Sequence, residues 1–209
     1  MLHVDPGSIV PSTRDLLQVL ATKRRSMALV GVIGSVQPAE EAARLHDLNV
    51  SALAATEPGV AMQLAARATK TVPMLALYAA ADRDAFLAAR FHGADGVCID
   101  AQQPLEEWDK LAKSARTTRM LPLALAVDDA SFDAAVTSGA RAILVRAPSA
   151  EIAIALAAKA PRAITVIAEI VGADGDALRA LRGHVDAAVV PASVHQDKGF
   201  AALVAELDP

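Results

Sequence analysis

ARFHGADGVCID, residues 89–100, is the stretch that decides the fold. Its first half has the composition of a helix end, and Gly93 can take the left-handed conformation that closes a helix. The apolar run Gly96–Asp100 follows at once and is typical of a buried strand. Similar turns occur at residues 138–141, SGAR, and more loosely at residues 183–186, GHVD. A turn of this kind that recurs along the chain indicates alternating helices and strands.

Short apolar runs of strand length alternate eight times with longer amphipathic segments of helix length. The predicted strands are Met27–Gly34, Val50–Ala55, Pro73–Tyr78, Gly96–Asp100, Leu121–Val127, Ala142–Arg146, Ile164–Glu169 and Ala187–Pro191. Nearly continuous apolar strands joined through helices require a parallel sheet whose outer face is covered. Eight such units predict a closed α/β (β/α)8 TIM barrel, with a doubly wound open sheet as the alternative.

A short extra N-terminal helix is expected over Ser12–Ala21, with Asp15 near its start. This helix would either cover the bottom of the barrel or lie beside its mouth. We expect one domain over residues 1–209, in which residues 1–26 form the N-terminal extension and helix and residues 27–209 form the barrel.

The composition is typical of a soluble globular protein, with 54% hydrophobic and 21% charged residues. The net charge of −4 and the cations scattered along the sequence argue against nucleic-acid binding, because phosphate contacts need cations gathered on one face. No apolar stretch is long enough to cross a bilayer, and the first residues do not resemble a secretory signal. A cytoplasmic location without membrane association is therefore expected, and the lone Cys98 is expected in the core.

No metal site and no cofactor are expected. The histidines are His3, His46, His92, His184 and His195, and they lack the spacing and the nearby cysteines that a zinc site needs. His195 follows the last predicted strand and is expected in an exposed loop. No glycine-rich nucleotide-binding loop is found either.

Four motifs, taken in their order along the chain, resemble one enzyme family. They are Thr56-Glu57-Pro58, Val72-Pro73-Met74-Leu75, the helix end Ala89–Asp95, and Val166-Ile167-Ala168-Glu169. Over about Asp15 to Leu207, this order is similar to that of the indole-3-glycerol phosphate synthases. The resemblance implies a TIM barrel and a carbon-carbon lyase of tryptophan biosynthesis that closes an indole ring on a phosphorylated substrate.

The same resemblance places most of the family's catalytic positions on side chains that cannot exchange a proton. Leu29 and Gly31 in the first strand and Leu125 in the fifth are such positions, and Ala76–Ala79 in the third strand lack the ammonium group of the family's lysine. The family's phosphate-binding turns correspond to Ile170–Gly172 and Pro191–Ser193, where proline and β-branched residues hinder contact with backbone amides. Because each lost acid or base typically costs a factor of about 10² to 10⁴, the ring closure should be abolished.

The remaining polar matches define the candidate site. Glu169 and Glu57 are the candidate catalytic residues, and the candidate substrate-binding residues are Arg146, Ser193, Gly172 and Thr56. Arg146 is expected to pair with Glu169 on the neighbouring strand, or else to bind a carboxylate or phosphate in a bidentate manner.

The leading hypothesis is a catalytically silent barrel, or pseudoenzyme, that binds a partner protein, another copy of itself or a small anion, as a monomer or homodimer. One alternative is a divergent active lyase that uses Glu169. The other is an enzyme acting on a different small phosphorylated or carboxylated metabolite, with Asp128 or Asp129 as base unless both only cap a helix.

Overall fold

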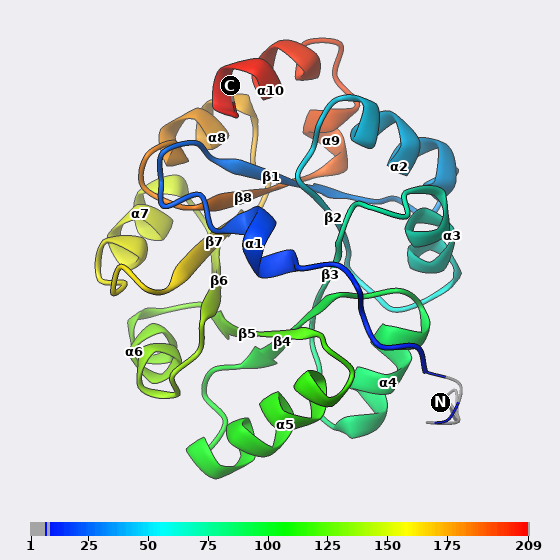
Figure 1. Ribbon diagram of the computed structural model, residues 1–209. Helices are drawn as coiled ribbons and strands as arrows, with labels where there is room; N and C mark the ends of the chain where they lie inside the picture. The colour runs from blue at the N-terminus through cyan, green and yellow to red at the C-terminus, as the bar shows by residue number, and fades with distance from the viewer. Residues whose placement is uncertain (1–6, 8, 209) are drawn as a thin grey trace.

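The structure is a computed structural model that describes Gly7 and residues 9–208, so His3 lies outside the described residues. Eight parallel strands pair in sequence order, and β1 also pairs with β8, which closes the barrel (Figure 1). The strands are β1 (Ala28–Val32), β2 (Ala52–Ala55), β3 (Met74–Ala79), β4 (Gly96–Asp100), β5 (Leu121–Ala126), β6 (Ala142–Ala147), β7 (Thr165–Ile170) and β8 (Ala187–Val190). The chain is a (β/α)8 TIM barrel with a short extra N-terminal helix, as predicted, and each predicted strand overlaps an observed one.

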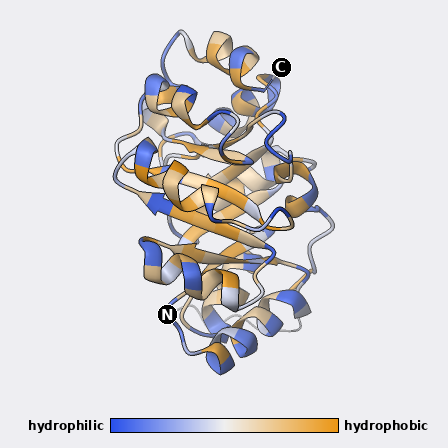
Figure 2. Ribbon diagram, turned by 90° about the vertical axis from the view of Figure 1, so that its left-hand side faces the viewer, coloured by the Kyte–Doolittle hydropathy of each residue, from blue (hydrophilic) through white to orange (hydrophobic). Residues whose placement is uncertain are grey.

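Most of the helices cover the outside of the barrel and connect consecutive strands, whereas the first precedes β1 and the last two follow β8. The helices are α1 (Leu16–Leu20), α2 (Pro38–Asp47), α3 (Val60–Ala68), α4 (Arg83–Phe91), α5 (Leu105–Thr117), α6 (Asp129–Thr137), α7 (Ala150–Ala158), α8 (Gly175–Leu181), α9 (Ala192–His195) and α10 (Phe200–Leu207). Several begin at an aspartate that accepts a hydrogen bond from the third helical residue, among them Asp82, Asp128 and Asp174. Figure 2 shows strands that are mostly hydrophobic and helices that combine hydrophobic and hydrophilic residues.

The barrel interior is filled by side chains and closed at one end by α1. Leu16 and Leu20 of this helix are buried in one cluster with the inward-facing residues Leu75, Leu123 and Leu144. Figure 1 shows α1 lying across the barrel end from which the strands start. A Cβ atom on Gly96 would lie 2.3 Å from Leu16 Cδ2, so glycine at this strand start permits the close approach of the helix. Of the two expected positions, α1 therefore occupies the bottom of the barrel.

The buried carboxylate of Asp95 anchors the segment that leads into α1. Its Oδ2 atom accepts from the backbone amide of Met74 at 2.8 Å and lies 2.7 Å from Arg14 Nε. Its Oδ1 atom accepts from Ser12 Oγ at 2.6 Å and from Arg90 Nη1 at 2.8 Å. Through Asp95, the glycine-alanine-aspartate turn recognised in the sequence therefore connects the starts of β3 and β4, helix α4 and the N-terminal segment.

The helices run antiparallel to the strands, and their charged ends give the barrel two different faces. Acidic residues occupy first turns, at the end where the strands stop: Glu40, Glu41, Asp84, Glu106, Glu107, Asp129, Glu151 and Asp176. Basic residues occupy last turns, where the helices run back toward the starts of the strands: Arg44, His46, Arg67, Arg90, Arg116 and Arg179. Each placement is favourable to the helix dipole. The last turn of α5 brings Arg116 to the face that carries α1, where Arg14, Arg119 and Arg141 also lie although they are spaced apart in the sequence.

Candidate functional site

Arg146 and Glu169 face each other at the C-terminal mouth of the barrel. The two residues are register partners on β6 and β7, and Arg146 Nε donates to Glu169 Oε2 at 2.8 Å. Arg146 Nη2 donates to the carbonyl oxygen of Leu77 on β3, also at 2.8 Å, so the side chain reaches across the barrel. The predicted pairing of Arg146 with Glu169 is confirmed. Both side chains keep contact with solvent, with 33% and 21% of their surfaces exposed.

Apolar side chains fill the barrel below this ion pair. Leu77, Leu125 and Cys98 are buried in the interior cluster. Burial, with a smaller contribution from the Glu169 carboxylate, raises the pKa of the Cys98 thiol to about 12, although the Arg146 guanidinium opposes this shift. Cys98 is therefore a neutral core thiol and not a nucleophile. Burial likewise raises the pKa of Tyr78 on β3, whose hydroxyl donates to the carbonyl oxygen of Ala85 at 3.0 Å.

The aspartates that follow β4 and β5 are held by local contacts. Asp100 Oδ1 accepts from the backbone amide of Gln102 at 2.9 Å. Asp128 caps α6, and its hydrogen bonds from the Ser131 hydroxyl and amide lower the pKa of its carboxyl. Asp129 forms an ion pair with Lys159. These contacts favour the capping interpretation of Asp128 and Asp129 over paired acid-base chemistry.

The other candidate site residues lie on loops around the mouth. Thr56 and Glu57 follow β2, and Ser193 lies in α9. All three are exposed and make no hydrogen bond or ion pair within the described part of the chain. Gly172 follows β7 with φ of +70° and open space around it. The structure therefore joins Arg146 to Glu169 by direct contact and leaves the remaining four residues without a contact to either.

Ser193 lines a groove of about 390 Å³ between the β7–α8 and β8–α9 connections. Asp174, Gly175 and Asp197 line the same groove, and so does Arg179, which is paired with Asp176 and Glu206. Asp174 caps α8 through its side chain. The polar groups that turn toward this groove are therefore mainly acidic or already paired.

The first strand is displaced by one residue from the alignment that the family resemblance suggested. Leu29 packs in the cluster between the sheet and the outer helices, and a Cβ atom on Gly31 would lie 2.7 Å from Leu45 of α2. The inward-facing residues are Val30 and, at the top of the strand, Val32. Because a shift of one residue reverses the direction of every side chain in a strand, Leu29 and Gly31 cannot occupy catalytic positions of the barrel interior.

His195 is buried, so the prediction that it lies in an exposed loop is wrong. Its Nε2 atom lies 2.7 Å from the carbonyl oxygen of Val32, and its Nδ1 atom lies 2.9 Å from Arg44 Nη2. Arginine can only donate, so Nδ1 accepts and the ring hydrogen is on Nε2, which donates to Val32. Arg44 also donates to the backbone carbonyl of His195 at 2.9 Å.

His195 therefore connects α9 to β1 and α2. No local pattern in the sequence indicates this connection. Glu41 contributes to the same cluster, because its Oε2 atom accepts from the backbone amide of Gly34 at 2.6 Å. Within the described residues, no group of three or more histidine, cysteine, aspartate or glutamate side chains could hold a metal ion. Among the helices that the structure describes, none is long and apolar enough to cross a membrane.

Comparison with known proteins identifies the fold and no family. No protein-family model matches the chain, and no curated protein matches it. Among solved structures, thiamine phosphate pyrophosphorylase from Pyrococcus furiosus is 17% identical with a TM-score of 0.62, over 88% of this chain and 95% of that one. A 3-hexulose-6-phosphate synthase is 15% identical with a TM-score of 0.66, over 87% and 98%. The N-acetylmannosamine-6-phosphate 2-epimerase from Clostridium perfringens is 15% identical with a TM-score of 0.66, over 88% and 92%.

The resemblance to indole-3-glycerol phosphate synthase is corrected by these comparisons. The three similar structures belong to other enzymes, and no family model supports that assignment. The helix-end motif Ala89–Asp95 has a structural explanation instead. Asp95 ties its turn to the start of β3, and Asp186 does the same for β7 by accepting from the backbone amide of Val166 at 3.0 Å. The turn motif that carried the resemblance is therefore explained by the architecture of the barrel.

Proposed function

We propose that this barrel binds a small phosphorylated or carboxylated metabolite at its C-terminal mouth, through Arg146, and does not catalyse a reaction there. The observation that carries the proposal is the position of the Arg146 guanidinium. It is held across the mouth by Glu169 and by the carbonyl oxygen of Leu77, each at 2.8 Å. In TIM barrels this end of the strands is where ligands bind.

Arg146 has a charged group suited to anions and one nitrogen atom that is free to bind them. It is the one lysine or arginine within the eight strands that the structure describes. Its Nη1 atom has no hydrogen-bond partner among the described residues. A guanidinium whose position is already fixed loses little side-chain entropy when it binds a carboxylate or phosphate, and its planar fork suits both groups. Glu169 partly neutralises the charge of Arg146, so the attraction of an anion from a distance is weak. An anion therefore gains most when it contacts the guanidinium directly.

The pKa shifts around the mouth support binding more than proton transfer. A general acid or base works best with a pKa near the operating pH. Burial raises the pKa of both Cys98 and Tyr78, and the hydrogen bonds from Ser131 lower that of Asp128. Each of these shifts moves the pKa of the group further from neutral pH.

A thermal-shift screen of phosphorylated and carboxylated metabolites tests the proposal, because a ligand that binds only the folded state raises the melting temperature. Arg146→Gln should abolish the rise, and Arg146→Lys should reduce it because lysine lacks the planar fork. Arg83→Gln is the matched control, since Arg83 is an exposed arginine in the first turn of α4. Melting temperatures that rise equally in the wild type and in Arg146→Gln would refute the proposal.

An enzyme acting on a small phosphorylated metabolite is the second candidate. It is favoured by the Glu169 carboxylate beside Arg146, a possible base next to an anion clamp at the catalytic end of the fold. The names of the three similar structures each include a phosphorylated compound, although likeness at this level supports the fold alone. Consumption of a ligand found in the screen, lost in Glu169→Gln, would favour this candidate over the first.

A further inference from the structure

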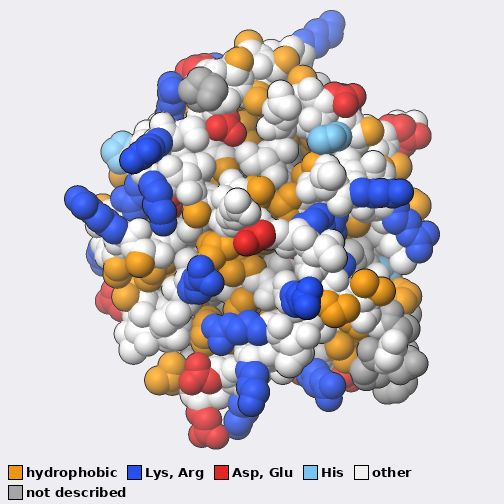
Figure 3. All heavy atoms as spheres, in the orientation of Figure 1, with side chains coloured by type: hydrophobic (Ala, Val, Ile, Leu, Met, Phe, Trp, Pro, Cys, Tyr) orange, Lys and Arg blue, Asp and Glu red, His pale blue; other side chains and the backbone are white. Residues whose placement is uncertain are grey.

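A second concave site lies at the opposite end of the barrel, on the face that carries α1. It is a pocket of about 430 Å³ between the segment before α1 and the starts of β5 and β6. Its apolar surface includes Leu17, Met120 and Leu121. Four arginines and two aspartates also line it, so its charge is positive although the chain as a whole is acidic. Figure 3 shows lysine and arginine side chains around hydrophobic atoms on this face.

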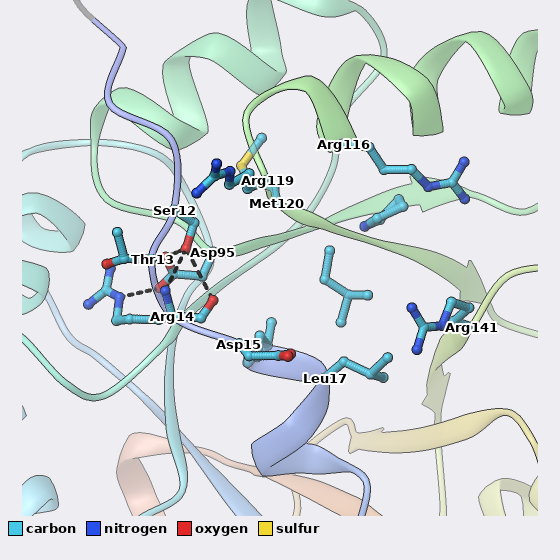
Figure 4. A pocket seen from close by; sticks show the side chains of 13 residues that line it. Ser12, Thr13, Arg14, Asp15, Leu17, Asp95, Arg116, Arg119, Met120 and Arg141 are labelled. Carbon is cyan, nitrogen blue, oxygen red and sulfur yellow. Dashed lines mark hydrogen bonds and ion pairs between the residues drawn. The ribbon is translucent and has the colours of Figure 1, made fainter.

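The side chains of three of these arginines have no partner among the described residues. Arg116, Arg119 and Arg141 are exposed, and their guanidinium groups make no hydrogen bond or ion pair with any residue that the structure describes. The fourth, Arg14, is paired with the buried Asp95. Figure 4 shows Arg119 on one side of the pocket and Arg116 and Arg141 on the other, with Leu17 below Arg141. The free cations therefore surround an apolar surface.

Arg119 stands at a turn position where three other helix-to-strand turns have glycine and the turn after α2 has Asn49 at φ of +59°. The turns after α4, α6 and α8 contain Gly93, Gly139 and Gly183 with φ of +105°, +70° and +82°. The turn after α5 has Arg119 at φ of +57°. A left-handed conformation is unfavourable for a residue with a Cβ atom, and such strain is commonly retained where a side chain has a function. No contact of the Arg119 side chain within the described residues explains why arginine occupies this position.

Arg141 stands where two other turns have a buried aspartate. The carbonyl oxygens of Asp95, Arg141 and Asp186 accept from the first amides of β5, β7 and β1, at 2.8, 3.0 and 2.9 Å. These three residues therefore have the same backbone role. Two of them turn a carboxylate inward to tie a strand, and Arg141 instead exposes a guanidinium beside the pocket.

We propose that this pocket binds a phosphorylated organic anion. Its phosphate would contact the free arginines, because guanidinium groups donate bidentate hydrogen bonds to phosphate oxygens. Its apolar part would lie on Leu17, Met120 and Leu121. The site is separate from the mouth, at the end of the barrel where catalysis is not found in this fold, and it does not rest on the function proposed for Arg146.

Phenyl phosphate is the probe, with inorganic phosphate and phenol as the two halves of the ligand. Thermal shift and calorimetric titration at low salt should give binding by phenyl phosphate, weaker binding by inorganic phosphate and none by phenol. Binding should weaken as salt is added. Arg119→Gly and Arg141→Gln should each weaken the affinity about tenfold or more, as expected for a lost charge-assisted hydrogen bond.

The variants separate a binding role from a structural one. Arg119→Gly should unfold at a higher temperature than the wild type without ligand, since glycine relieves the left-handed backbone, and yet bind less well. Arg67→Gln removes an arginine of the same face that does not line the pocket, and its affinity should be unchanged. The proposal is overturned if phenyl phosphate does not bind, or binds to Arg119→Gly and Arg141→Gln as tightly as to the wild type. Binding that is lost only in Arg146→Gln would overturn it too and would assign the anion to the mouth.

Discussion

Arg146 Nε lies 2.8 Å from Glu169 Oε2, so the only basic residue of the described strands is bound to a carboxylate on the neighbouring strand. An arriving anion meets a guanidinium that is already oriented and partly neutralised. Its affinity then depends on how strongly Glu169 competes for the arginine.

Glu169→Gln should strengthen anion binding at the mouth, because the variant keeps the position of Arg146 and removes the competing charge. The lost ion pair should lower the free energy of unfolding by about 1 kcal/mol, a small value because both side chains are partly exposed to solvent. Titration calorimetry and urea denaturation measure the two effects. If the substitution instead abolished binding, Glu169 would be a direct ligand contact and the second candidate function would gain support.

Asp95→Asn should be strongly destabilising. The carboxylate is fully buried and holds Arg14, Arg90, Ser12 and the amide of Met74. Removing its charge leaves buried donors without a matching acceptor, at a cost of about 3 to 5 kcal/mol in the free energy of unfolding. Urea denaturation measures the change. Asp109→Asn, at an exposed position of α5, should change stability by less than about 0.5 kcal/mol, and similar losses in the two variants would contradict the anchoring role of Asp95.

Gly96→Ala should displace α1 from the bottom of the barrel. The added methyl group would meet Leu16 at 2.3 Å, and overpacking of this kind costs about 1 to 3 kcal/mol. Faster amide hydrogen exchange in residues 16–20 would report the displacement. Gly139→Ala is a contrasting control, because no atom lies within 4 Å of its added carbon and its penalty would come from φ of +70° alone. Exchange in α1 that is unchanged by Gly96→Ala would show that the glycine is not needed for this packing.

Stability should decrease as the pH rises above about 9. In the folded state burial raises the pKa of Cys98 from 9.0 to about 12 and also raises that of Tyr78 above 10.0. The unfolded chain releases both protons first, so alkaline pH favours unfolding by up to about 1.4 kcal/mol per pH unit for each retained proton.

Urea denaturation at several pH values from 8 to 11 measures this slope. Cys98→Ala and Tyr78→Phe should each make the slope shallower, whatever they do to stability at neutral pH. An identical slope in the wild type and in both variants would mean that neither proton is retained on folding.

The barrel and its ion pair could be predicted because both depend on local pattern. Eight apolar runs separated by helices determine the order of the strands, and strand ends that are neighbours in that order bring Arg146 to Glu169. The burial of His195 could not be predicted, because its partners Val32 and Arg44 lie more than 150 residues away in the sequence.

The direction of Leu29 could not be inferred from a short apolar strand, in which inward and outward residues look alike. The gathering of arginines at one end also escapes a linear inspection, since it results from helices that all end on the same face. The resemblance to a synthase family failed for a related reason. Turns such as Gly93-Ala94-Asp95 hold parts of the barrel together, so they do not distinguish one family from another.

The most direct test of the central claim is a crystal structure of the protein soaked in selenate, a tetrahedral dianion whose selenium gives an anomalous signal. The account predicts an anomalous peak within hydrogen-bond distance of Arg146 Nη1 at the mouth, absent from crystals of Arg146→Gln. A peak at the mouth that persists in Arg146→Gln, or density that shows the mouth empty while selenate occupies other sites, would contradict it.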